Sequence, residues 1–375
     1  MEASTRPRTA PRRALLRTSA RLLWAGLAAC TAPGTLPALR AAAQSLRHGP
    51  GQPSTAAPAA PASLPPVPQG PLTELLDRIP RLSRWVTPNE TFYRVSKNLF
   101  DPRVRAERWR LRVDGLVEQP FELTYPELDQ LPGRVEQFTT LSCISNPVGG
   151  NLIGNARWTG VPLRTLLQRA RLRPGVVDLR FEAADGYTES IPLEKALHPE
   201  TLLAWRMNGQ ALPDNHGFPA RLIVPGIYGM KHVKWITRIE AVGEDYLGFW
   251  EDQGWSDEAV VQTLSRIDVP QEGDTVGPGP VFVAGIAFAG DRGISRVEVS
   301  PDGGRNWYAA ELEPSPTPIT WVRWVWQWRA PSPGRYTLAV RACDGRGRWQ
   351  DPEERPPLPD GATGLHRITV TWKAG

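Results

Sequence analysis

The residue with the clearest capacity for chemistry is Cys143, within the stretch TTLSCISNPVGG from Thr139 to Gly150. The residues before it have the pattern of a strand end, and the Asn-Pro and Gly-Gly pairs after it are typical of turns. A cysteine at such an edge is either buried packing or a thiolate presented to a metal or a substrate. Taken alone, the stretch favours packing, so a chemical role for Cys143 depends on the residues that accompany it.

Three further groups of reactive or charged residues follow in the same half of the chain. Tyr187 lies at a turn or strand edge in ADGYTESIP. His216 and Arg221 lie five residues apart, in a loop rich in Pro and Gly that leads into a short apolar segment typical of a strand. The run GMKHVKW then supplies Lys231, His232 and Lys234.

The basic residues of these groups predict an anion-binding site. Arg221, Lys231 and Lys234 carry positive charge, and the glycines around them leave backbone N–H groups free to point at phosphate oxygens. Neither group matches the glycine-rich loops of nucleotide-binding proteins. Taken alone, MKHVKW is more typical of a solvated strand face and His216 of an ordinary loop histidine, so the prediction depends on the combination.

Short strands and helices must hold these residues in place. We expect strands in WRLRVDGLV and VVDLRFEAA, a helix capped by Thr124 in TYPELDQLP, an amphipathic helix in VPLRTLLQRA, and a strand that runs into a helix in IPLEKAL. Mixed elements without a regular βαβ repeat indicate an α+β fold rather than a doubly wound one. We assign this domain to residues 72–262, after a linker rich in Pro and Ala over 44–71.

From about Thr263 the pattern changes to strands alone. The segments VFVAGIAFAG, ISRVEVS, NWYAAELE, WVRWVWQWRA and RYTLAVRA are apolar or alternating, and turn sequences such as PDGG and SPGR separate them. This spacing predicts an immunoglobulin-like β-sandwich over residues 263–375. Cys343 falls in one of its strands, where we expect small buried packing, although a disulfide with Cys143 is also open.

Most of the net charge lies at the N-terminus. Residues 1–48 contain eight arginines and one acidic residue, which gives +7. The rest of the chain has 44 − 8 basic and 39 − 1 acidic residues, which gives −2. The overall charge of +5 is therefore a property of the N-terminus, and we expect no nucleic-acid partner.

Residues 1–43 have the pattern of an export signal. Paired Arg12 and Arg13 precede an uncharged stretch and a small-residue cleavage site. The segment resembles a twin-arginine signal, so we expect a periplasmic or other extracytoplasmic location. LAAC at 27–30 also resembles a lipoprotein box, which would make Cys30 a lipid anchor, whereas interrupting prolines and glycines disfavour a membrane-spanning helix.

Taken together, the motifs resemble the sulfite oxidase family of molybdenum enzymes. MNGQALPDNHGFPARLIVPGIYGMKHVKW, GNARWTGVPL and GYTESIPL are similar to stretches of that family, and VEVSPDGGRNW and LAVRACDGRGRWQ are similar to its molybdenum-cofactor oxidoreductase dimerisation domain. The resemblance extends from about Asn89 to the C-terminus. It implies a sulfite-oxidase-type molybdopterin-binding domain followed by the sandwich. It also implies an oxidoreductase that transfers an oxygen atom with one molybdenum, held by molybdopterin, per chain.

The resemblance also implies roles for individual residues. Cys143 would ligate molybdenum as a thiolate, which suits a soft metal centre. Tyr187 would lie near the exchangeable oxygen of the metal, and Arg94 would be a further catalytic residue. The residues implied to hold the pterin and its phosphate are Asn89, Phe92, Tyr93, His216, Arg221, Lys231, His232, Val233 and Lys234.

The run after Cys143 departs from true sulfite oxidases. In those enzymes an arginine of this run helps to bind sulfite, whereas this chain reads CISNPV, with Val148 at that position. From the resemblance we expect sulfite or a related small sulfur oxo-compound as the substrate. Because of this departure, reduction of a sulfoxide, as in the methionine-sulfoxide reductases of the family, is the alternative. No haem-attachment motif occurs in the sequence, so we expect electron exchange with a separate cytochrome or membrane subunit. The sandwich implies a homodimer, with a monomer as the alternative.

Two other classes of function are open. A thiol hydrolase would use Cys143 as the nucleophile, with His216 or His232 as its base. A non-catalytic exported binding protein would keep the fold without the chemistry. Molybdenum and pterin in the purified protein would separate the expected enzyme from both.

Overall fold

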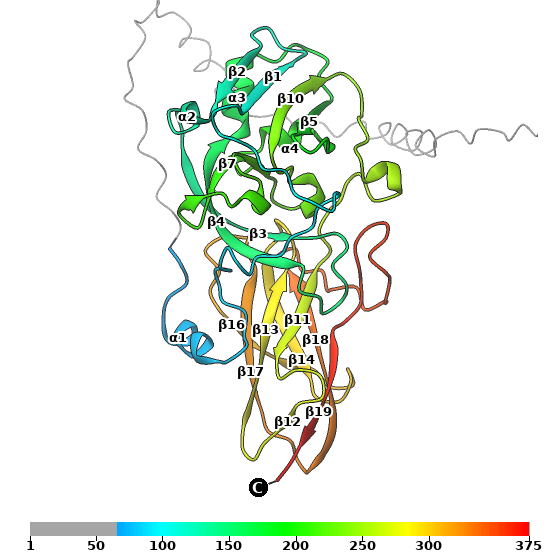
Figure 1. Ribbon diagram of the computed structural model, residues 1–375. Helices are drawn as coiled ribbons and strands as arrows, with labels where there is room; N and C mark the ends of the chain where they lie inside the picture. Colours follow the sequence, from blue (N-terminus) through cyan, green and yellow to red (C-terminus); the bar gives the residue numbers. More distant parts are fainter. Residues whose placement is uncertain (1–65, 375) are drawn as a thin grey trace, which may run out of the picture. The chain divides into compact units, whose positions relative to one another are not determined.

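The computed structural model describes residues 66–374, which belong to one compact unit (Figure 1). The predicted export signal over 1–43, with its box at 27–30, and most of the linker over 44–71 lie outside the described residues and stay predictions. Within 66–374, no helix has the length and apolar character needed to cross a membrane.

Two β-sheets form the α+β part of the described chain. One has the strand order β2-β1-β10-β5-β6, in which β1 and β10 are parallel and the other pairs antiparallel. The other has the order β3-β4-β7-β8, and β9 also pairs with β7. Their strands are β1 Arg110–Gly115, β2 Phe121–Thr124, β3 Val135–Ser142, β4 Ile153–Pro162, β5 Asp178–Ala183, β6 Thr188–Pro192, β7 Leu202–Met207, β8 Gln210–Ala211, β9 Arg221–Ile223 and β10 Ile236–Val242. The helical elements are α1 Pro71–Arg78, α2 Tyr125–Leu128, α3 Leu163–Ala170 and α4 Leu193–Leu197, with 3₁₀ turns η2 Asp214–His216, η3 Gly229–Lys231 and η4 Glu251–Gln253.

Two further sheets form the predicted sandwich. Their orders are β11-β13-β17-β16 and β12-β19-β18-β14-β15, and buried side chains from both sheets make one apolar core. The strands are β11 Leu264–Val269, β12 Thr275–Val276, β13 Val281–Phe288, β14 Ile294–Ser300, β15 Tyr308–Ala309, β16 Glu311–Leu312, β17 Val322–Trp328, β18 Gly334–Asp344 and β19 Arg367–Trp372. The α+β class and the β-sandwich are confirmed, whereas the domain boundary near Thr263 stays a prediction.

Local sequence explains the helices that were predicted. At the start of α2 the backbone N–H of Thr124 donates to Glu127 Oε2 at 2.7 Å, which is half of a capping box. In α3 the buried residues recur at the spacing of one helix face, and they are Leu163, Leu166, Leu167 and Ala170. The predicted strands at β1 and β5, and the passage from β6 into α4, are confirmed as well.

One predicted strand, and one alternative interpretation of a basic run, are different in the structure. NWYAAELE is not one strand, because β15 pairs with β14 in one sandwich sheet and β16 pairs with β17 in the other. GMKHVKW is not a solvated strand face: Gly229–Lys231 is a 3₁₀ turn, and the side chains of Lys231 and His232 are buried. The second difference bears directly on the site, because it removes two charged or titratable groups from solvent.

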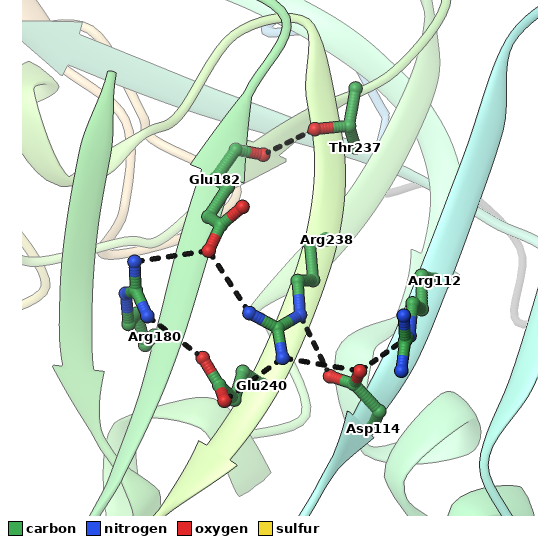
Figure 2. Close-up of polar contacts among 7 residues, drawn as sticks. All are labelled: Arg112, Asp114, Arg180, Glu182, Thr237, Arg238 and Glu240. Atoms are coloured by element: carbon green, nitrogen blue, oxygen red, sulfur yellow. Dashed lines mark hydrogen bonds and ion pairs between the residues drawn. The ribbon is translucent and has the colours of Figure 1, made fainter. Parts of the chain in front are cut away.

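A ladder of ion pairs crosses three strands of the first sheet (Figure 2). Arg238 on β10 donates to Asp114 on β1 at 2.9 Å and to Glu182 on β5 at 3.0 Å. Glu240, also on β10, accepts from Arg180 on β5 at 3.0 Å. Partly exposed pairs of this kind contribute little stability individually. The main effect of the ladder is to place opposite charges next to each other on the three neighbouring strands.

The segment around Cys143 rests on a core that draws residues from both parts of the unit. Phe138 and Ile144 pack in one cluster with Phe288 and Trp321 of the sandwich region. The backbone also joins the two parts, because the Trp321 N–H donates to Thr140 Oγ1 at 2.9 Å. In Figure 1, β3 lies beside the ends of the sandwich strands. The sandwich therefore supports the strand that ends immediately before Cys143.

Candidate active site

One cavity brings most of the predicted site residues together. It opens between the loop before β1, the end of β3, the turn before β6 and the segment from η2 to Trp235. The predicted residues that line it are Phe92, Tyr93, Arg94, Cys143, Tyr187, His216, Arg221, His232, Val233 and Lys234. Asn89 and Lys231 were predicted as well, and the structure places both outside this lining.

Cys143 lies at the first position after β3, and its thiol faces the cavity while remaining largely buried. Its backbone N–H donates to Leu152 O at 2.9 Å, and Sγ lies 2.9 Å from Ser145 Oγ. Burial raises the pKa of the thiol, so ionisation needs a metal or another positive partner. Cys143 and Cys343 are both free and buried, so the disulfide alternative is wrong and the predicted packing role of Cys343 agrees with its burial.

Arg221 is a buried cation without a matching anion. Its guanidinium donates to the carbonyl oxygens of His216 at 3.1 Å and His232 at 3.2 Å, and its carbon lies 5.1 Å from the ring centre of Trp158. Within residues 66–374 no carboxylate forms an ion pair with it. Burial lowers the pKa of Arg221 to about 10, which leaves it charged at neutral pH. A charge in this position is costly unless an anion joins it, which is what an anion-binding site requires.

Lys234 adds a second positive charge at the same end of the cavity. Its Nζ donates to Ser96 Oγ at 2.8 Å and to Asn215 O at 3.3 Å, and it forms no ion pair in the described part of the chain. Burial, and then the charge of Arg221, lower the pKa of Lys234 to about 8. The nearby Asn215 Oδ1 is buried without a hydrogen-bond partner in residues 66–374. At this end of the cavity, the described residues therefore supply no counter-ion to Lys234 and no hydrogen bond to Asn215 Oδ1.

Both histidines of the site are neutral in the folded protein. Burial lowers the pKa of His216 to about 4 and that of His232 to about 3, and the positive charge of Arg221 adds to the effect. His232 Nδ1 accepts the Val224 N–H at 3.3 Å, so its Nε2 carries the proton and donates to Ile227 O at 3.2 Å. His216 Nε2 lies 2.9 Å from the carbonyl oxygen of Asn89 and donates to it. Asn89 thus orients His216 from behind the cavity wall.

An aromatic pair and one arginine form another wall. Phe92 packs edge-on against Trp158 and His216, and Tyr93 stacks on Phe92 with ring centres 5.4 Å apart. Burial strongly raises the pKa of the Tyr93 hydroxyl, which therefore stays protonated. Arg94 lines the cavity and is exposed, so its guanidinium can meet an incoming anion.

Tyr187 and Lys231 take part in a polar network beside the cavity. The Tyr187 hydroxyl lies 2.8 Å from Glu189 Oε2 and 2.9 Å from Met230 O. Lys231 Nζ lies 2.7 Å from Glu189 Oε1 and 2.6 Å from Glu251 Oε1. The positive charge of Lys231 is therefore matched by carboxylates and is not available to an anion in the cavity, unlike that of Arg221.

The sequence reasoning missed several lining residues. Trp250 and Trp255 come from the segment around η4, which contains none of the motifs that predicted the site. Val148, the position where sulfite oxidases keep arginine, does not line the cavity; it borders a smaller hollow with Arg266 and Gln350. Glu189 could have been predicted beside the site, because it lies inside the motif GYTESIP close to Tyr187.

Models of two protein families match this chain. The oxidoreductase molybdopterin binding domain matches residues 98–250, and the Mo-co oxidoreductase dimerisation domain matches residues 258–354. An α+β domain with this cavity, followed by a β-sandwich, thus defines the class of molybdopterin-binding oxidoreductases.

Individual relatives narrow the class. Mitochondrial sulfite oxidase of Rattus norvegicus is 35% identical over 294 residues, covering 66% of this chain and 54% of that protein. Sulfite oxidase of Arabidopsis thaliana is 30% identical over 284 residues, covering 63% of this chain and 72% of that protein. The crystal structure of the sulfane dehydrogenase SoxCD from Paracoccus pantotrophus has a TM-score of 0.66 and 25% identity, and the match covers 89% of this chain and 96% of that one. The chain belongs to the sulfite oxidase family. It spans only about half the length of the mammalian relatives that it matches.

The cavity fits the cofactor of that family, molybdenum bound by molybdopterin. A metal–pterin group would supply a soft metal to the thiol of Cys143 and a phosphate to the uncompensated charges of Arg221 and Lys234. The orphaned Asn215 Oδ1 and the neutral histidines could meet the polar edges of the pterin. These residues would hold and orient the group, which would supply the redox chemistry when it is bound.

Proposed function

We propose that this chain is a molybdenum-dependent oxygen-atom-transfer oxidoreductase that oxidises sulfite or a related small sulfur oxo-compound. The observation that carries the proposal is a single cavity lined by Cys143, Tyr187 and the unpaired cation Arg221. Oxidation of sulfite consumes one water and releases sulfate, two protons and two electrons. The cofactor, when bound, would accept the electrons, and the residues of the cavity would bind and orient the substrate and transfer the protons.

The residues divide into roles by their surroundings. Cys143 would hold the metal, whereas the positive charges of Arg221 and Lys234 would hold the phosphate. Tyr187 presents a protonated hydroxyl to the cavity, because burial and the charge of Glu189 hold its pKa well above the ordinary value. The exposed Arg94 is the candidate for the first contact with an anionic substrate.

Reduction of a sulfoxide is the second candidate function. Met230, Trp250 and Trp255 line the cavity and would suit the alkyl part of a sulfoxide better than a small oxo-anion. In addition, the run after Cys143 places Val148 where a sulfite-binding arginine would lie in true sulfite oxidases. The same protein architecture serves both directions, since an oxygen atom moves between sulfur and the cofactor in each.

The partners and the location are part of the proposal. Electrons would pass to or from a separate cytochrome or membrane subunit, since no haem-attachment motif occurs in the given sequence. The sandwich would pair two copies of the chain, in keeping with the dimerisation family that it matches. Export by the twin-arginine route is favoured by Arg12 and Arg13, with the box at 27–30 as a second way to reach the membrane surface.

The test uses protein from a host that makes molybdopterin. We expect about one molybdenum and one pterin per chain, oxidation of sulfite with a ferricyanide-type acceptor, and slower or absent reduction of methionine sulfoxide with a reduced viologen dye. The reverse order of rates would establish the second candidate. A folded protein without metal or pterin would refute both, and reaction of Cys143 with an alkylating reagent in such a protein would point to the thiol hydrolase.

A further inference from the structure

A buried group of three carboxylates and one lysine lies behind Tyr187. Lys231 at the end of η3 contacts Glu189 of β6 at 2.7 Å, Glu251 of η4 at 2.6 Å and Asp257 at 3.3 Å. The side chains of Lys231, Glu189 and Glu251 are at most 2% exposed, whereas that of Asp257 is 22% exposed. The group therefore runs from the protein interior to solvent.

The charges in this group do not balance. One ammonium faces three carboxylates, two of them fully buried, so the group carries excess negative charge unless a carboxyl holds a proton. Glu251 Oε2 is buried and has no hydrogen-bond partner in residues 66–374. Burial, and the charge of Glu251, raise the pKa of Glu189 to about 8 although Lys231 opposes the shift. With this raised pKa, Glu189 can hold a proton at neutral pH.

Tyr187 connects this group to the cavity. Its hydroxyl has two acceptors within reach, Glu189 Oε2 at 2.8 Å and Met230 O at 2.9 Å, but only one proton to donate. When Glu189 is protonated, its carboxyl donates to the Tyr187 oxygen and the hydroxyl donates to Met230. When Glu189 is ionised, the hydroxyl donates to Glu189 instead. The remaining titratable group beside Tyr187 is Asp185, which accepts the Tyr187 N–H at 3.0 Å.

We propose that Glu189 is a proton-relay residue that links the Tyr187 hydroxyl in the cavity to solvent through Lys231 and Asp257. The inference rests on the proposed function and names how its protons leave. Lys231 first gives a proton to Asp257, which releases it to water, and Glu189 then returns a proton to Lys231. The hydroxyl proton of Tyr187 moves to the ionised Glu189 while a proton from the cavity forms a bond to the Tyr187 oxygen, so each relay residue ends as it began. The electrons of the reaction leave separately, through the cofactor to an external acceptor.

The relay serves either direction of oxygen transfer. Oxidation of sulfite releases two protons for each pair of electrons, and reduction of a sulfoxide consumes two. The alternative explanation is that Lys231 and its carboxylates only fasten η3 to β6 and η4. If the role were only structural, the effect on kcat of replacing Glu189 would be the same in both directions of the reaction, in water and in deuterium oxide. It would also not depend on the protonation state of Glu189.

The first experiment compares Glu189→Gln with wild-type holoenzyme, using a ferricyanide-type acceptor for sulfite and a reduced viologen dye for methionine sulfoxide. Gln keeps the shape of Glu but cannot carry a proton. We expect unchanged molybdenum content and KM, a kcat lower by about 10²-fold, and loss of the pH dependence near the Glu189 pKa. Wild-type kcat should show a solvent deuterium effect that the variant alters. A variant with wild-type kcat and an unchanged pH profile would overturn the relay.

Glu313→Gln is the matched control. Glu313 is equally buried and pairs with Arg323 at 2.7 Å, but it lies in the sandwich and outside the cavity lining. We expect this substitution to lower stability and to leave the pH profile and the deuterium effect unchanged. The same loss of pH dependence in both variants would show that it reports damaged packing, and would overturn the proposal.

A second readout needs no turnover, so it separates this inference from the proposed function. The infrared spectrum of the wild-type protein should contain the C=O band of a buried protonated carboxyl at pH 7. The band should disappear as the pH rises through about 8, and Glu189→Gln should lack it while Glu313→Gln keeps it. A protein that is inactive on every sulfur compound but shows this titration would refute the function and keep the proton site. Absence of the band at pH 7 would refute the relay whatever the activity.

Discussion

Replacement of Arg221 by Met tests whether the cavity is built for an anion. The guanidinium is buried, donates to two backbone carbonyls, and has no carboxylate partner in the described residues. Burial lowers its pKa from the ordinary value of arginine to about 10, and since each pKa unit corresponds to about 1.4 kcal/mol, holding the charge there costs about 3 kcal/mol. The folded pKa lies far above neutrality, so this cost is fully present at pH 7.

Two effects of Arg221→Met therefore oppose each other in the cofactor-free protein. The substitution removes the cost of the buried charge, but it also leaves the carbonyls of His216 and His232 without their donors. Each lost hydrogen bond costs about 1–2 kcal/mol, so we expect the free energy of unfolding to change by no more than about 1 kcal/mol. In protein made with cofactor the balance differs, because the variant has lost the charge that pairs with phosphate. We expect its molybdenum content to fall several-fold.

The assay is urea unfolding of cofactor-free protein together with molybdenum analysis of protein from a competent host. Arg323→Met is the matched control, because Arg323 is as buried as Arg221 but donates to Glu313 at 2.7 and 2.8 Å. Its removal strands a buried carboxylate and should cost about 3–5 kcal/mol, with normal molybdenum content in the folded fraction. If Arg221→Met lost as much stability as the control and kept its molybdenum, Arg221 would be a structural residue and the anion site would be refuted.

Three further outcomes can be measured on the same protein. Cys143→Ser should fold normally but lose turnover by several orders of magnitude, because a hydroxyl is a poor replacement for a thiolate ligand; near-normal turnover would show that Cys143 does not hold the metal. Since the pKa values of His216 and His232 are lowered in the folded state, stability should fall as the pH drops from about 6.5 towards 4, by up to about 1.4 kcal/mol per pH unit for each histidine. Replacing His232 by Asn should flatten that dependence in urea titrations, and an unchanged slope would contradict the assignment. Thr140→Val should lower the free energy of unfolding by about 1–3 kcal/mol, because it leaves the buried Trp321 N–H without its acceptor. A change below about 0.5 kcal/mol in calorimetry would show that this hydrogen bond does not stabilise the fold.

Much of the fold follows from local sequence. Thr124 and Glu127 form the capping box that starts α2, and Leu163 to Ala170 have the spacing of one buried helix face. The strand NWYAAELE was predicted wrongly as one element, because its alternation is compatible with a strand throughout. The change of sheet between Ala309 and Glu311 is set by which neighbours each half pairs with. Pairing partners far along the chain are not visible in a local pattern.

The candidate site was predictable as a set of residues rather than as an arrangement. Cys143, Tyr187 and His216 line one cavity as the motifs implied, although the roles assigned to them stay predictions. Asn89 was expected to hold the cofactor directly, whereas the structure places it behind the cavity, where its carbonyl orients His216. The contribution of Trp250 and Trp255 could not be predicted, because the segment around η4 that carries them into the cavity contains none of the motifs.

Lys231 and Lys234 show what a sequence motif leaves undetermined. They lie three residues apart in one basic run, and charge alone gave both the same predicted role. In the structure Lys231 is surrounded by carboxylates, so its charge is more than matched, whereas Lys234 has only neutral acceptors and stays available to an anion. The 3₁₀ turn at Gly229–Lys231 turns the chain so that the two side chains enter different surroundings. Lys231 therefore suits the proposed proton transfer, and Lys234 suits the proposed binding of the cofactor. The difference arises from the acidic residues of β6 and η4, which no inspection of the basic run itself could supply.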